Sequence, residues 1–120
     1  MNSPVIPYEE QVNAVATLSV HELLKKYVKD ERYRLVPGLY LKIEKNDLIA
    51  YFKKKPSVAL DHLTNCQKNR DKLFTDTNIL LQEEGKFIVA GLDHGRLVGR
   101  KEFQTLEEAC AEYVLSLYWL

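Results

Sequence analysis

The stretch GKFIVAGLDHGRLVGR (residues 85–100) leads into FQTLEEACAEYVL (residues 103–115), and the two together decide the fold. Two apolar runs flank the turn signal Asp93-His-Gly, an arrangement typical of a β-hairpin. Thr105 and Glu108 have the spacing of a capping box, which marks the start of a helix. We therefore expect a β-hairpin and then an amphipathic helix from Leu106 to about Trp119. Its expected buried face consists of Leu106, Ala109, Cys110, Tyr113, Val114 and Leu117.

A second β-hairpin is expected over residues 37–55. Its first strand alternates apolar and polar residues, its second strand is a continuous apolar run, and a polar pair separates them. Three lysines close the second strand, and lysines in that place commonly protect the edge of a sheet. In chain order, these features are the turn Pro37-Gly, the residues Leu39, Leu41 and Ile43, the pair Asn46-Asp, the run 48–52 and lysines 53–55.

Helices are expected before and after this second hairpin. Residues 8–30 form either two short helices with a break near Ser19 or one bent helix, because Ser19 and Glu22 also have capping-box spacing. Ser57 is expected to cap a further helix that runs to about Leu73. Beyond it, residues 79–82 predict a strand that a turn at residues 83–85 connects to the first hairpin.

The predicted order of elements is α-ββ-α-βββ-α. Because short turns join the strands, the pairing should be antiparallel, so the fold class is α+β with helices packed on one face of a sheet of about five strands. At 120 residues, the chain has the size of one domain, which we place at residues 1–120.

Composition excludes several classes of protein. Apolar residues make up 46% and charged residues 28%, which is typical of a globular domain and not of a disordered chain. No stretch is long and apolar enough to span a bilayer, so no membrane partner is expected. The net charge is zero, although residues 32–72 carry an excess of basic residues and residues 73–120 an excess of acidic ones. This balance favours neither nucleic acid nor anionic lipid as a partner.

Local signatures of catalytic and cofactor sites are absent from the sequence. His21, His62 and His94 lack a second histidine at the spacing of a zinc site, and neither a Cys-x-x-Cys pair nor a phosphate-binding glycine motif occurs. We expect no metal, no cofactor and no catalytic residue. An enzyme would require His94 or His62 to converge with a carboxylate in a pocket. Cys66 and Cys110 are interpreted as buried thiols of a protein in the reducing cytoplasm.

Two further groups of residues have alternative interpretations. The basic residues of the middle segment either contact phosphates, with Tyr51 and Phe52 nearby, or form a solvated edge. The neutral net charge favours the solvated edge, so no nucleic acid is expected. Seven tyrosines and Trp119 either straddle the boundary of the core or contribute to a protein interface. The basic residues are lysines 53–55, Lys68, Arg70 and Lys72, and the tyrosines are Tyr8, Tyr27, Tyr33, Tyr40, Tyr51, Tyr113 and Tyr118.

Residues 85–96 (GKFIVAGLDHGR), with residues 102–114 (EFQTLEEACAEYV), resemble small bacterial immunity proteins. These are the antidotes of contact-dependent growth inhibition and other polymorphic toxin systems. The shared pattern is a strand, a polar turn with glycine, a second strand, and an aromatic residue that leads into Thr-x-Glu-Glu-Ala and an apolar helix. The helix-rich start of the chain and the segment Pro37-Gly-Leu-Tyr are also similar.

The resemblance implies a non-catalytic cytoplasmic protein that binds the C-terminal domain of a cognate toxin and blocks its active site or substrate path. Such toxins are often nucleases. On this basis, the toxin-binding residues are expected at the hairpin turns, with nearby aromatic residues as apolar anchors. A cytoplasmic adaptor or regulatory module with another partner is the alternative hypothesis. The predicted toxin-binding residues are Glu83, Glu84, Asp93, His94 and Arg96.

Overall fold

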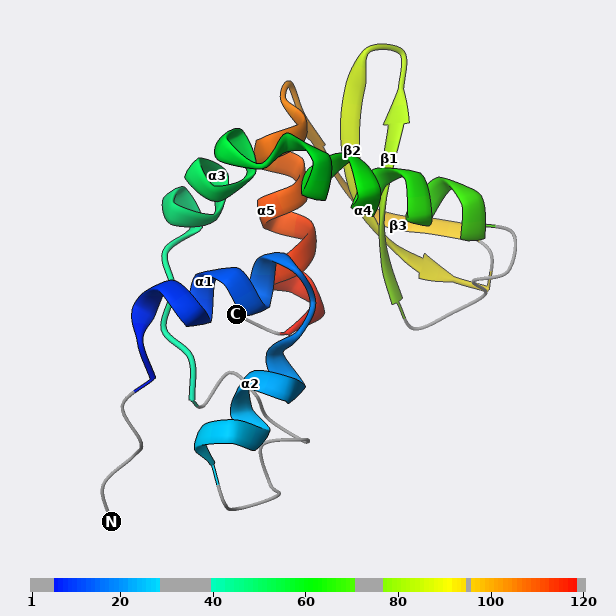
Figure 1. Cartoon of the computed structure of the whole chain (residues 1–120). Coiled ribbons are helices and arrows are strands. Elements are labelled where there is room, and N and C mark those ends of the chain that lie inside the picture. The colour runs from blue at the N-terminus through cyan, green and yellow to red at the C-terminus, as the bar shows by residue number, and fades with distance from the viewer. Residues whose placement is uncertain (1–5, 29–39, 71–76, 95, 119–120) are drawn as a thin grey trace.

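The computed structural model describes residues 6–28, 40–70, 77–94 and 96–118. The described chain contains five helices and three strands (Figure 1). The α+β class is therefore confirmed, with more helix and less sheet than expected. In chain order the elements are α1 (Tyr8–Ala16), α2 (Val20–Tyr27), α3 (Lys45–Lys54), α4 (Pro56–Asn69), β1 (Thr77–Glu83), β2 (Lys86–Asp93), β3 (Arg96–Phe103) and α5 (Leu106–Leu117).

The three strands form an antiparallel sheet in the order β1-β2-β3. Glu83 pairs with Lys86, so the β1–β2 loop has two residues. These residues, Glu84 and Gly85, have φ angles of 50° and 78°. Positive φ at both central positions is the requirement of the type I′ turn, which matches the twist of the flanking strands. This local chemistry explains why the strand expected at residues 79–82 and both strands of the C-terminal hairpin are confirmed.

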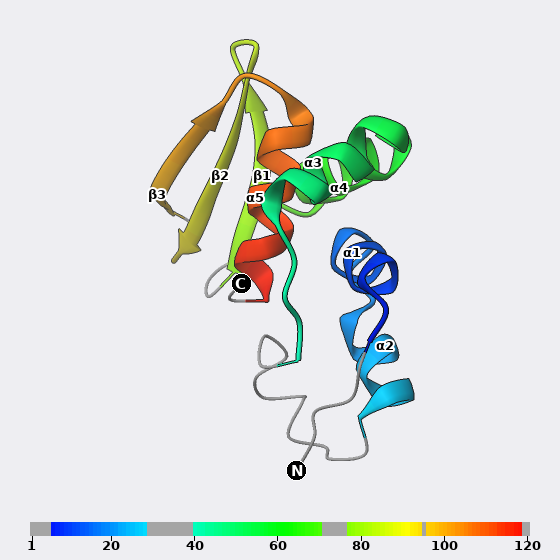
Figure 2. The ribbon, with the colours of Figure 1, turned by 90° about the vertical axis from the view of Figure 1, so that its left-hand side faces the viewer.

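Helix α5 is the central element of the core. It contacts α1, α3, α4 and all three strands. The helices lie to one side of the sheet, and β3 is the strand farthest from α1 and α2 (Figure 2). The predicted cap is confirmed, because the backbone N–H of Glu108 donates to Thr105 Oγ1 over 3.3 Å and Thr105 Oγ1 donates to Glu108 Oε1 over 2.9 Å. The cap thereby fixes the start of the helix around which the other elements pack.

The expected hairpin over residues 37–55 is wrong. Its second strand is helix α3, residues 41–44 form no strand, and the turn Pro37-Gly with Leu39 lies outside the described residues. A helix fits here because Leu48 and Phe52, four residues apart, both point into the core and are 0% exposed. Asp47 in the first turn and Lys53 in the last turn also suit the helix dipole. The sheet therefore has three described strands rather than about five, and the lysines end a helix rather than protect a sheet edge.

Two of the predicted helix starts require correction. The break near Ser19 is confirmed, but the Ser19 hydroxyl does not cap α2 and instead lies 2.8 Å from Thr17 Oγ1. Helix α4 begins at Pro56 rather than after Ser57 and ends at Asn69, whereas its predicted end at Leu73 lies outside the described residues. Proline suits the first position of a helix because that position needs no N–H donor.

Leu18, between α1 and α2, has a left-handed backbone with φ of 57° and is 37% exposed. The Leu18 N–H donates to the Val15 carbonyl over 3.3 Å, and the Ser19 N–H donates to the Ala14 carbonyl over 2.8 Å. This is the hydrogen-bond pattern of a Schellman motif, which normally places glycine at the left-handed position. The connection between α1 and α2 therefore contains backbone strain at an exposed leucine.

Most of the buried residues of the helices and strands form one hydrophobic cluster that includes both cysteines. Cys66 and Cys110 are buried free thiols, as expected, and burial raises the pKa of the Cys110 thiol. Within the described ranges, none of the helices is long and apolar enough to cross a membrane.

Candidate functional site: two grooves beside helix α1

The five predicted toxin-binding residues do not form one site. Glu83 and Glu84 lie at the β1–β2 turn, whereas Asp93, His94 and Arg96 lie at the β2–β3 turn. Consecutive turns of an antiparallel sheet lie at opposite ends of the strand that they share (Figure 1). At about 3.3 Å per residue, the two groups are separated by roughly 23 Å along β2.

The charges at these turns are partly compensated within the sheet. Arg100 Nη2 donates to Glu83 Oε2 over 2.9 Å. At the other end, His94 Nε2 lies 3.6 Å from Asp93 Oδ1, and Arg96 pairs with Asp93 in the strand register. The Glu83 carboxylate is therefore less available to a partner than the sequence indicates.

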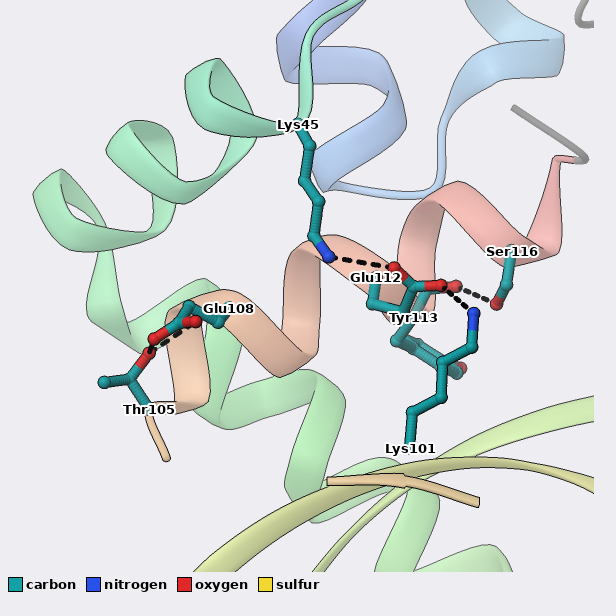
Figure 3. Close-up of polar contacts among 7 residues, drawn as sticks. All are labelled: Lys45, Lys101, Thr105, Glu108, Glu112, Tyr113 and Ser116. Carbon is teal, nitrogen blue, oxygen red and sulfur yellow. Dashed lines mark hydrogen bonds and ion pairs between the residues drawn. The ribbon is translucent and has the colours of Figure 1, made fainter. Parts of the chain in front are cut away.

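A stronger charge cluster joins α3, β3 and α5 (Figure 3). Lys45 and Lys101 each donate to the carboxylate of Glu112 over 2.9 Å. These two hydrogen bonds lower the pKa of Glu112. Lys45 Nζ also lies 5.0 Å from the centre of the Phe103 ring, a cation–π contact. The cluster connects elements that are distant in sequence, so its role is to hold α5 against its neighbours.

A groove lies between α1 and α3, and we call it the α1–α3 groove. Its volume is about 480 Å³. Tyr8 is hydrogen-bonded to Asp47 near the start of the two helices, and Asn13 is hydrogen-bonded to Tyr51 farther along, so α1 lies beside α3. The groove is lined by Tyr8, Glu9, Val12 and Asn13 of α1, by Asp47, Ala50, Tyr51 and Lys54 of α3, and by Lys55.

Two tyrosine hydroxyls fasten α1 to α3 and set the shape of this groove. Tyr8 OH donates to Asp47 Oδ2 and accepts a hydrogen bond of 3.0 Å from the Glu44 N–H, at the start of α3. The bond to Asp47 is the main cause that raises the pKa of Tyr8. Tyr51 OH donates to Asn13 Oδ1 over 2.9 Å. The hydroxyls are thus occupied within the chain, while Tyr8 is still 42% exposed.

The α1–α3 groove has opposite charges at its two ends. Glu9 and Asp47 lie where the helices begin, and Lys54 and Lys55 lie where α3 ends. Lys55 Nζ is 5.1 Å from the centre of the Tyr51 ring. Among the residues that the structure describes, neither Glu9 nor Lys54 has an ion-pair partner. A ligand of this groove therefore meets a negative end, an apolar middle and a positive end.

A second groove lies between α1 and α2, and we call it the α1–α2 groove. Its volume is about 400 Å³, and it shares Glu9 and Asn13 with the first groove. Lys26 Nζ is 3.8 Å from Glu10 Oε1, and Tyr27 OH donates to Glu10 Oε2 over 2.8 Å. Three carboxylates face one lysine, so this groove is acidic. It is lined by Glu9, Glu10, Asn13, Ala14, Ser19, Glu22, Leu23 and Lys26.

The other residues singled out from the sequence have different environments. His62 Nε2 lies 2.6 Å from the Ala16 carbonyl, and its ring packs against Phe52 and Tyr113. The lysines at the end of α3 and Lys68 at the end of α4 are separated by the 14 residues of that helix, roughly 20 Å. The basic residues thus form no single phosphate-binding patch within the described part, and Lys72 lies outside it. No cluster of three metal-ligating side chains occurs among the described residues.

Sequence reasoning missed the residues of the α1–α3 groove because it assigned residues 48–52 to a strand. The signal was nevertheless present. Asp47, Ala50, Tyr51 and Lys54 have the i, i+3, i+4, i+7 spacing of one helix face. Their partner Tyr8 could not be found in this way, since it lies 39 residues from Asp47 in the chain.

No protein-family model matches the chain, and no curated protein and no solved structure is significantly similar to it. Its function must therefore be inferred from its own residues.

Proposed function

We propose that this chain is a protein-binding inhibitor, specifically an immunity protein that binds the C-terminal domain of a cognate bacterial toxin and blocks its active site. The observation that carries this proposal is the hollowed surface around α1, where charged side chains line two adjoining grooves and two tyrosine rings line the α1–α3 groove. Such a surface suits a protein partner, because aromatic rings supply rigid apolar contact area and charged groups at the margin select the partner.

The acidic α1–α2 groove suits a toxin that acts on nucleic acid. A nuclease holds phosphates with lysine and arginine, so its active site attracts carboxylates. Glu9 and Glu22 are exposed and have no ion-pair partner among the described residues. Complementary charges of this kind speed the association of two proteins. The turn residues Glu83, Glu84, Asp93, His94 and Arg96 form, in this proposal, a second contact region with weaker charge.

A cytoplasmic location is part of the proposal. The two cysteines are buried free thiols, and a thiol whose pKa is raised by burial stays protonated and unreactive. Such thiols suit a reducing compartment. A non-catalytic role is likewise proposed, since neither of the two grooves beside α1 is lined by His62 or His94.

A growth test examines this proposal directly. The C-terminal region of the polypeptide encoded immediately upstream, roughly 200–300 residues, would be expressed in bacteria with and without this protein. Growth should stop without the protein and be restored by it. The variant Val15→Asp is the control, because it places a carboxylate at a position that is 0% exposed and should prevent folding.

Two outcomes would contradict the proposal. A region that is not toxic, or toxicity that persists with this protein present, would remove the immunity role and favour the adaptor hypothesis. Rescue by Val15→Asp would show that the folded protein is not what restores growth.

A further inference from the structure

The α1–α3 groove offers more information about a partner than its volume alone. On α3, Asp47 and Lys54 are seven residues apart, which places them two turns apart on the same helix face. At 1.5 Å per residue, their backbone positions are separated by about 10 Å. Ala50 and Tyr51 lie between them and, with Val12 of α1, supply the apolar middle of the groove.

A helix is the element that fits this arrangement. Two neighbouring helices leave a furrow into which the side chains of a third helix can pack. Residues seven apart on a partner helix also project from one face at a spacing of about 10 Å, so they can reach both charged ends of the groove together. An apolar residue three or four positions from each of these two partner residues would then contact the apolar middle of the groove.

The direction of the partner helix follows from charge. A lysine or arginine must lie at the Glu9 and Asp47 end, and a carboxylate must lie at the Lys54 and Lys55 end. Helices are stabilised by acidic residues near their start and basic residues near their end. A partner helix that satisfies both conditions begins at the lysine end and therefore runs antiparallel to α3.

We infer that the α1–α3 groove is a docking site for an amphipathic helix of a partner protein that carries Glu or Asp at position i, an apolar residue at i+3 or i+4, and Lys or Arg at i+7. This inference rests on the proposed protein-binding function and adds the chemistry and direction of the partner segment. Glu9 and Asp47 contact the basic residue, and Lys54 contacts the acidic one. Nucleic acid does not fit, since two carboxylates at one end repel phosphates.

The first test uses synthetic helical peptides, so that it does not depend on the identity of the partner. One peptide carries Glu at i, Leu at i+4 and Lys at i+7, and the second exchanges Glu and Lys. Each would be titrated into the full ¹⁵N-labelled chain. The first peptide should bind about tenfold more tightly and should shift backbone signals of residues 8–13 and 47–55. Equal binding of the two peptides, or no shift in these segments, would overturn the inference.

The matching protein variant is Glu9→Lys with Lys54→Glu, which cancels the charge at each end and keeps the net charge of the chain. It should bind the first peptide about tenfold more weakly and lose the preference between peptides. The control is Glu107→Lys with Lys68→Glu, which exchanges the same residue types at a first and a last helical turn elsewhere. Loss of preference in the control as well would also contradict the inference.

The growth test separates the inference from the proposed function. If the folded groove variant restores growth as well as the unchanged protein and the two peptides bind equally, the inference fails while the immunity role stands. If the unchanged protein does not restore growth but the peptide preference is observed, the immunity role fails and the groove remains a docking site for another protein.

Discussion

The surface around α1 and the surface formed by the sheet and α5 use their charged residues differently. On the sheet and α5, carboxylates such as Glu83 and Glu112 are hydrogen-bonded to cations of neighbouring elements. Around α1, Glu9 and Lys54 are exposed and form no ion pair with another described residue. Charges that are paired inside the chain stabilise the fold, whereas exposed charges beside a groove remain accessible to a partner. Under the proposed function, the sheet and α5 therefore serve mainly as the folding surface and the residues around α1 mainly as the recognition surface.

The largest expected effect tests whether the recognition surface depends on the core beneath α3. Phe52 is 0% exposed and packs edge-on against Tyr51, which lines the α1–α3 groove. Phe52→Ala should lower the free energy of unfolding by about 3–5 kcal/mol, because it removes a buried ring and leaves a cavity. Urea denaturation at neutral pH measures this change. Leu60→Ala is the control, since Leu60 is 54% exposed.

If Phe52→Ala lowered the free energy of unfolding no more than Leu60→Ala does, α3 would not be packed as described. The α1–α3 groove would then lose its structural basis. That result would leave the description of the sheet unchanged, because the turns of the sheet are formed by local chemistry.

The second prediction concerns the charge cluster of the folding surface. Glu112→Gln should lower the free energy of unfolding at neutral pH by about 1 kcal/mol, because both lysine partners are partly exposed and solvent weakens the two bonds. The pKa of Glu112 is lowered in the folded protein. Its contribution is therefore complete above the ordinary glutamate pKa of about 4.3 and is lost as the pH falls through the lowered value.

Denaturation at several pH values checks this prediction. The difference between the two proteins should disappear in acid, where the natural glutamate is itself protonated. Glu102→Gln is the matched control, since its carboxylate lies 3.4 Å from Lys86 in an exposed pair and should change stability by less than about 0.5 kcal/mol. A difference for Glu112→Gln that persists in acid would attribute the effect to packing rather than to charge.

The parts of the fold that could be predicted from the sequence are those with local causes. A two-residue turn containing Gly85, and the capping box of Thr105 and Glu108, act within a few residues of the chain. Helix α3 could not be predicted in this way, because the apolar run 48–52 is locally compatible with a strand. Burial of Leu48 and Phe52 against distant elements decides the conformation.

The candidate site was harder to predict than the fold for the same reason. The α1–α3 groove depends on Tyr8, which reaches Asp47 across 39 residues of sequence. The turn residues could be placed on turns, yet the sequence contains no local signal that they occupy opposite ends of β2. Both cases show that the local sequence indicates which element contains a residue. It does not indicate which elements lie close together in space.

The third prediction compares the backbone of the two surfaces. The sheet places Gly85 at a positive φ of 78°, whereas the α1–α2 connection places Leu18 at 57°. Leu18→Gly should raise the free energy of unfolding by about 0.5 kcal/mol, because relief of the left-handed strain exceeds the entropic cost of glycine. Leu18→Ala should give no gain, since alanine keeps the Cβ. A loss of stability on Leu18→Gly would show that the leucine side chain contributes more to packing than its exposure indicates.

The smallest effect separates two adjacent residues of the predicted toxin-binding set. Glu83 is paired with Arg100, whereas Glu84 forms no ion pair within the described segments of the chain. Glu83→Gln should lower the free energy of unfolding by about 0.5 kcal/mol, as expected for a partly exposed pair, and Glu84→Lys should leave it unchanged. Glu84→Lys is therefore the cleaner test of binding at this turn. If it leaves growth rescue and toxin affinity unchanged while the α1–α3 groove variant abolishes both, recognition belongs to the α1 surface alone.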